Sequence, residues 1–100
     1  MRFKKGVKIF GVRNELTLAM IIANEVYRNH GYGCTITSGV EGTHSKASLH
    51  YSGCAFDTRT RDIEDWIVSS IYSDIKDSLN DEYDVILESD HIHIEFQPKR

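Results

Sequence analysis

The strongest constraint on the fold is an apolar stripe in the second half of the chain. Its members recur at spacings of three and four residues, which is the period of one face of an α-helix. They are Ile63, Trp66, Ile67, Ile71, Ile75 and Leu79. Asp62 is a suitable helix start, and the polar run 80–82 ends the pattern. We therefore predict a helix after Asp62 whose whole stripe packs into the core.

The remainder of the chain predicts one more helix and several short strands. A helix capped by Asn14 and running to about His30 is expected, because Gly31 and Gly33 follow it. Strands are predicted where residues alternate or are rich in β-branched side chains: 7–10, 34–38, 54–58, 83–87 and 91–96. The expected fold class is α+β, with a small antiparallel sheet flanked by two helices.

Length and charge limit the classes of function. One hundred residues predict a single domain over 1–100 and a monomer. With 12 basic and 15 acidic residues and no block of like charge, nucleic acid is not an expected partner. No apolar stretch is long enough for a membrane span. Glu15 interrupts the basic start ahead of the apolar run 16–23, so we expect no signal peptide and synthesis in the cytoplasm.

The two cysteines allow several states. Cys34 and Cys54 can pair, bind a metal or pack as small apolar residues, and buried free thiols are the favoured interpretation. Alternation along a strand places Cys54 on the face opposite Asp57, which argues against a thiolate ligand beside that carboxylate.

Two short segments, 48–57 and 90–93, combine histidines with carboxylates. A catalytic zinc usually takes three protein ligands and leaves a fourth position for water, and His50, Asp57 and His93 supply such a set. His91 and His93 share one face of a strand. Glu95 lies on that face too, and we interpret it as a solvated carboxylate at a sheet edge. The sequence therefore predicts a Zn²⁺ site.

The same segments resemble a known family. A Ser-x-His-x-x-Gly-x-Ala-x-Asp pattern, followed by a His-x-His strand, is similar to the zinc D-Ala-D-Ala carboxypeptidases and L-alanyl-D-glutamate peptidases. The amino-terminal signalling domain of hedgehog proteins shares that fold, and the likeness to it is especially close. The resemblance extends over roughly residues 34 to 97. It rests on Ser48, His50, Gly53, Ala55, Asp57, Glu88-Ser89, His91-Ile92-His93 and His44-Ser45.

The resemblance implies a role for each matching residue. His50, Asp57 and His93 are the implied zinc ligands, while His91 and His44 line the cleft and assist the developing oxyanion. The implied general base is an acidic residue shortly before the last ligand. Asp90 is preferred for that role over Glu88, although either carboxylate can reach a zinc-bound water from the turn at 88–90.

The activity that the resemblance implies is zinc-assisted hydrolysis of amide bonds in peptidoglycan stem or cross-link peptides. Small enzymes of this kind serve as bacteriophage endolysins or in bacterial wall remodelling, so the protein would act on the cell wall after release or export. Family members commonly carry an arginine after a Ser-Gly pair to bind a substrate carboxylate, and the segment 38–41 has none. Glu41 would repel a terminal carboxylate, so cleavage within the stem is expected unless Lys46 or Arg59 substitutes.

Two alternatives to the enzyme remain. The first is a catalytically silent, hedgehog-like zinc domain that binds a peptide or a protein. In the second, zinc has only a structural role and stabilises the fold of a domain of marginal size. Ser48 is interpreted as a capping or loop-closing hydroxyl, because no separate histidine and acid are arranged to activate it as a nucleophile.

Overall fold

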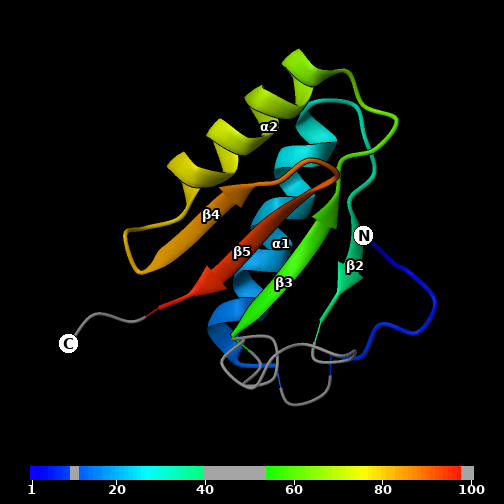
Figure 1. Ribbon diagram of the computed structural model, residues 1–100. Helices are drawn as coiled ribbons and strands as arrows, with labels where there is room; N and C mark the ends of the chain where they lie inside the picture. Colours follow the sequence, from blue (N-terminus) through cyan, green and yellow to red (C-terminus); the bar gives the residue numbers. More distant parts are fainter. Residues whose placement is uncertain (10–11, 40–53, 98–100) are drawn as a thin grey trace.

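A computed structural model describes residues 1–9, 12–39 and 54–97 of the chain. Two helices and five strands follow one another in this part of the chain (Figure 1). They are β1 (Arg2–Phe3), α1 (Asn14–Asn29), β2 (Thr35–Ser38), β3 (Ala55–Arg59), α2 (Asp65–Ser78), β4 (Tyr83–Leu87) and β5 (His91–Phe96). The strands form one sheet in the order β1-β2-β3-β5-β4.

The sheet is mixed, so the expectation of a purely antiparallel sheet is wrong at one strand. β2 with β3, β3 with β5 and β4 with β5 are antiparallel, whereas β1 is parallel to β2. The reason is the connection between them, because α1 carries the chain from β1 back to the start of β2, and parallel strands need such a crossover. The α+β class is confirmed.

The first strand also lies earlier than predicted. β1 pairs through hydrogen bonds from the Arg2 amide to the Cys34 carbonyl and from the Lys4 amide to the Ile36 carbonyl, both 2.8 Å. Gly6, with a φ of 92°, then turns the chain. Residues 7–9 are therefore outside the sheet, although the side chain of Val7 still packs against the core.

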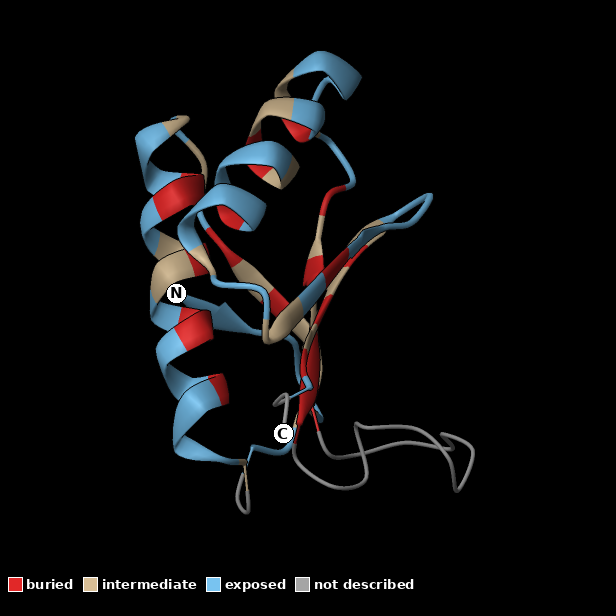
Figure 2. Ribbon diagram, turned by 90° about the vertical axis from the view of Figure 1, so that its left-hand side faces the viewer, coloured by how far each residue is buried: buried red, intermediate tan, exposed pale blue. Residues whose placement is uncertain are grey.

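Both helices lie on one face of the sheet, as Figures 1 and 2 show. Along β5, Ile92, Ile94 and Phe96 point toward the helices and are buried, and Phe56 and Thr58 of β3 do the same. Alternation sends the intervening side chains to the other face, which no described helix covers. We call this second side of the sheet the open face.

The long helix α1 follows its prediction closely. It buries Leu16, Ala19, Met20, Ala23, Val26 and Tyr27 against the sheet. Gly31 follows with a φ of 86°, a left-handed conformation that ends helices at little steric cost in glycine. The N-cap position is occupied by Arg13 rather than Asn14, without a capping hydrogen bond from its side chain.

The second helix begins later than Asp62, whose φ is 69°, and one member of the predicted stripe is not in the core. Val68, Ile71 and Ile75 face inward, whereas Trp66 is 69% exposed and its indole Nε1 donates to Glu64. Each residue turns a helix by ~100°, so Trp66 lies about 160° away from Val68 around the axis. The spacing in the sequence includes Trp66 in the stripe because it lies three residues after Ile63, but Ile63 precedes the first turn of the helix.

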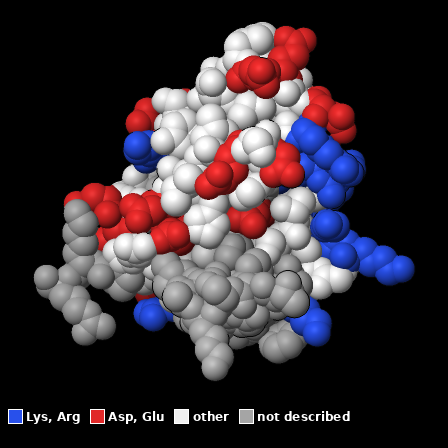
Figure 3. All heavy atoms as spheres, in the orientation of Figure 1, with Lys and Arg blue, Asp and Glu red and all other residues white. Residues whose placement is uncertain are grey.

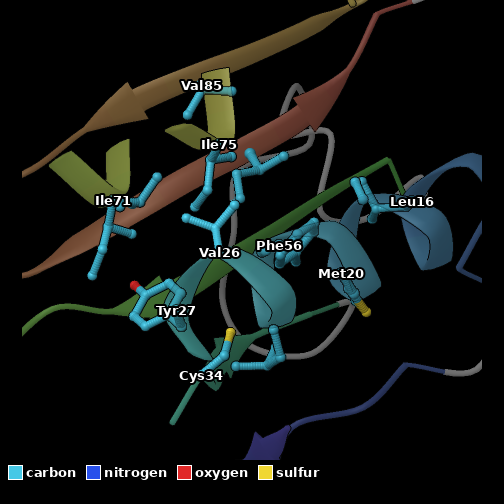
Figure 4. Close-up of a cluster of buried hydrophobic side chains, with 14 of the residues drawn as sticks. Leu16, Met20, Val26, Tyr27, Cys34, Phe56, Ile71, Ile75 and Val85 are labelled. Atoms are coloured by element: carbon cyan, nitrogen blue, oxygen red, sulfur yellow. The ribbon is translucent and has the colours of Figure 1, made fainter. Parts of the chain in front are cut away.

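Residues from both helices and the sheet meet in one core (Figure 4). Tyr27 is fully buried, and its hydroxyl lies 2.9 Å from the Thr58 hydroxyl and donates to the Arg59 carbonyl at 2.9 Å. Both cysteines, Cys34 and Cys54, are buried thiols, as predicted, and burial raises the pKa of the Cys34 thiol to about 12. None of the helices in the described residues is long and apolar enough to cross a membrane.

Candidate metal centre

Two of the three predicted zinc ligands meet on the open face. Asp57 of β3 and His93 of β5 are directly opposite each other in the antiparallel register. Their side chains point the same way, and Asp57 Oδ1 lies 2.8 Å from His93 Nδ1. The two side chains are only 15% and 19% exposed, so this contact is largely shielded from solvent.

The third predicted ligand, His50, lies outside the described residues. The same is true of His44, Ser48 and Gly53, and of Glu41 and Lys46. Among the residues that the structure does describe, no cluster of three or more His, Cys, Asp or Glu side chains is arranged to hold a metal ion.

Glu95 belongs to the centre, which corrects its interpretation as a solvated edge carboxylate. β5 lies between β3 and β4 rather than at the edge, and the Glu95 side chain is only 13% exposed. Its Oε1 lies 2.7 Å from His93 Nε2. Two residues along a strand share a face, so the His-x-Glu spacing was the sequence signal for this contact.

This arrangement matches the usual surroundings of a metal-binding histidine. Such a histidine commonly donates its second ring N–H to a carboxylate, which fixes the tautomer and the ring orientation. With Nε2 held by Glu95, Nδ1 is the nitrogen that faces Asp57. Zinc bonds of ~2.0–2.1 Å in a tetrahedral site require ligand atoms ~3.3 Å apart. The pair therefore fits zinc if it opens by about half an ångström.

In the metal-free chain, His93 Nδ1 faces Asp57 as a hydrogen-bond partner. The hydrogen bond to Asp57 raises the pKa of His93, burial opposes this, and the hydrogen bond to Glu95 raises the pKa further. Because the ligand nitrogen must be deprotonated to bind a metal, the proton and zinc compete for Nδ1.

Asp90 and His91 add two more polar side chains beside Asp57. His91 Nδ1 lies 2.7 Å from Asp90 Oδ1, and His91 Nε2 lies 3.9 Å from Asp57 Oδ1. The hydrogen bond from His91 is the main cause that lowers the pKa of the Asp90 carboxyl. The carboxylate preferred as the base is thus connected to the candidate ligand Asp57 through His91.

Glu88 lies in a different part of the surface. It lines a cavity of about 320 Å³ together with Asp62, Asp65 and Val68, at the start of α2. Asp57, Asp90 and His91 instead line a second pocket of about 250 Å³. The turn at 88–90 therefore separates the two acidic residues that were considered for the role of base.

The pocket beside Asp57 also has a basic side. Lys4, Arg59 and Arg61 line it together with Asp57 and Asp90. Figure 3 shows Lys and Arg side chains gathered on the right-hand side of the open face, with Asp and Glu side chains further to the left. Of these three residues, only Arg59 was predicted from the sequence as a possible contact to a substrate carboxylate.

Comparison with protein-family models, with curated proteins and with solved structures found no match to this chain.

Proposed function

We propose that this protein is a zinc peptidase that hydrolyses amide bonds in peptidoglycan stem or cross-link peptides, on a fold like that of hedgehog domains and D-Ala-D-Ala peptidases. The observation that carries the proposal is the contact of Asp57 with His93 across adjacent strands, together with the carboxylate of Glu95 behind the imidazole. This contact joins one residue from each of the two sequence motifs of the resemblance, because Asp57 and His93 lie 36 residues apart in the sequence.

The proposal assigns the chain's own residues as follows. His50, Asp57 and His93 would hold the metal, and Glu95 would orient the imidazole of His93. When bound, zinc supplies polarisation of the scissile carbonyl and activation of water. Asp90 accepts the proton of the attacking water and returns it to the leaving amine. His91, whose Nε2 faces Asp57, donates a hydrogen bond to the developing oxyanion.

Metal content and hydrolysis of purified peptidoglycan test this assignment together, in the parent chain and in Asp90→Ala and Glu88→Ala. We expect about one zinc per chain in all three. Asp90→Ala should lower the rate by roughly 10²–10⁴-fold, the usual contribution of a general base. Glu88→Ala is the matched control, because it removes a carboxylate two residues away that lines the other cavity.

Other results would change the assignment in defined ways. Loss of cleavage in Glu88→Ala alone would move the base to Glu88. Zinc without hydrolysis by the parent would favour the hedgehog-like binding domain, and absence of zinc from the purified chain would reject the metal centre.

A further inference from the structure

Three cationic side chains from separate segments line the pocket beside the candidate metal centre. Lys4 follows β1, Arg59 is the last residue of β3, and Arg61 lies two residues beyond it. The chain as a whole has a net charge of −3, so a pocket with three cations differs from the average surface. Such a concentration of positive charge raises the local concentration of anions.

These cations have no anionic partner within the described part of the chain, where none of the three forms an ion pair or a side-chain hydrogen bond. The two carboxylates of the same pocket already contact histidines, Asp57 with His93 and Asp90 with His91. The positive charge is therefore available to a ligand rather than neutralised by the protein.

The position of Arg59 relates the pocket to the proposed reaction site. Arg59 is two residues after Asp57 on the same face of β3, and it is paired in register with His91. Strand geometry places the Cα atoms of Asp57 and Arg59 about 6.6 Å apart. An extended peptide advances ~3.3–3.6 Å per residue, so a group one or two residues beyond the scissile amide reaches Arg59. The hydrogen bond from Tyr27 to the Arg59 carbonyl holds this end of the strand to α1.

We propose that Arg59 and Arg61, with Lys4, bind a carboxylate of the substrate one or two residues from the bond that is cleaved. The guanidinium fork matches a planar carboxylate in a bidentate manner, which gives both affinity and orientation. This inference rests on the proposed peptidase function. The segment 38–41 has no arginine to bind a substrate carboxylate. In this proposal the cations at the end of β3 bind that carboxylate instead.

Binding without turnover tests the proposal. An acetylated stem tripeptide with free carboxylates, and the same peptide with every carboxylate amidated, are titrated into the full chain after zinc has been chelated. Without zinc, a free carboxylate has no metal to bind. We expect the acid to bind the parent at least roughly tenfold more tightly than the amide, the usual size of a charge-assisted contact.

Two variants locate the effect. In Lys4→Gln/Arg59→Gln/Arg61→Gln the acid and amide should bind equally, and Arg61→Gln alone, an exposed change, should reduce the preference in part. Lys76→Gln on α2 removes one charge away from the pocket and should leave the preference unchanged. Equal affinity of the parent for both peptides, no measurable binding of either, or a preference that survives the triple variant would overturn the proposal.

The outcome can be separated from that of the peptidase assignment. A parent that hydrolyses peptidoglycan without preferring the acid would reject the carboxylate site alone. A parent that prefers the acid but contains no zinc and hydrolyses nothing would reject the peptidase and leave an anion-binding pocket.

Discussion

The imidazole of His93 lies between the carboxylates of Asp57 and Glu95, and its ring orientation depends on both. If Glu95 selects the tautomer that presents Nδ1 to the metal, Glu95→Gln should weaken zinc binding by roughly 10–100-fold. This is the usual effect of mutating a carboxylate that orients a metal-binding histidine. Competition with a chromophoric chelator measures the affinity directly. Asp84→Asn is the control, because Asp84 is exposed and is paired with Glu95 in register on β4. An unchanged affinity in Glu95→Gln would contradict the orienting role.

The raised pKa of His93 has a consequence for stability in the metal-free chain. A group whose pKa is higher in the folded state stabilises the fold below its unfolded pKa, and this stabilisation disappears as the pH rises through the folded pKa. The contribution of His93 should therefore be complete below about pH 6.5 and decline above it.

Urea unfolding of the zinc-free parent and of His93→Gln, from about pH 5 to about pH 9, measures this contribution. The difference in unfolding free energy between the two chains should be largest at the acidic end and shrink as the pH rises. A difference that is constant with pH would show that the imidazole gains no proton-linked stability from Asp57 and Glu95.

At the scale of single residues, the sequence predicted the pair that meets and missed what supports it. Asp57 and His93 were recognisable because each belongs to a motif with internal spacing. Glu95 was misjudged because its burial depends on β5 being an inner strand, and strand order is not written in the local pattern of β5. The basic side of the pocket was missed for a similar reason, since Lys4 is distant from Arg61 in sequence.

Among the elements, α2 offers a sharp comparison between a buried and an exposed apolar residue. Ile75 is fully buried, and Ile75→Ala should lower the free energy of unfolding by roughly 2–5 kcal/mol. Trp66→Ala should change it by less than about 0.5 kcal/mol, although Trp66 is the larger side chain. Urea denaturation of both variants checks this, and a loss in Trp66→Ala comparable to that in Ile75→Ala would place Trp66 in the core.

The elements themselves were predicted with uneven success. The bounds of β4 and β5 follow from alternation and match the structure, and α1 ends where glycine begins. β1 was placed five residues too late, because a two-residue strand is stabilised by its pairing with β2 and has no periodicity of its own. The start of α2 was placed too early at Asp62, since an acidic residue marks a helix start only where its backbone is suitable.

For the whole molecule, zinc binding should be linked to folding. A ligand that binds only the folded chain stabilises it by roughly 2.7 kcal/mol at a hundredfold excess over its dissociation constant, or roughly 10–20 °C in Tm for a domain of this size. Thermal unfolding with and without zinc measures the shift. Asp57→Asn should lose most of it, and Mg²⁺, which prefers octahedral oxygen ligands, should produce none in the parent. An equal zinc shift in Asp57→Asn would remove Asp57 from the ligand set.

The sequence by itself determined which residues are apolar on one side of each element, and so determined the two main helices, most of the strands and the pairing of chemistry-bearing side chains on one strand face. These features depend on periods of 2.0 and 3.6 residues, which are local properties of the backbone. Only the tertiary structure decided the parallel pairing of β1, the inner position of β5, and the side of the turn on which Asp90 and Glu88 lie. Each of these depends on contacts between segments far apart in the chain, and no short-range pattern records them.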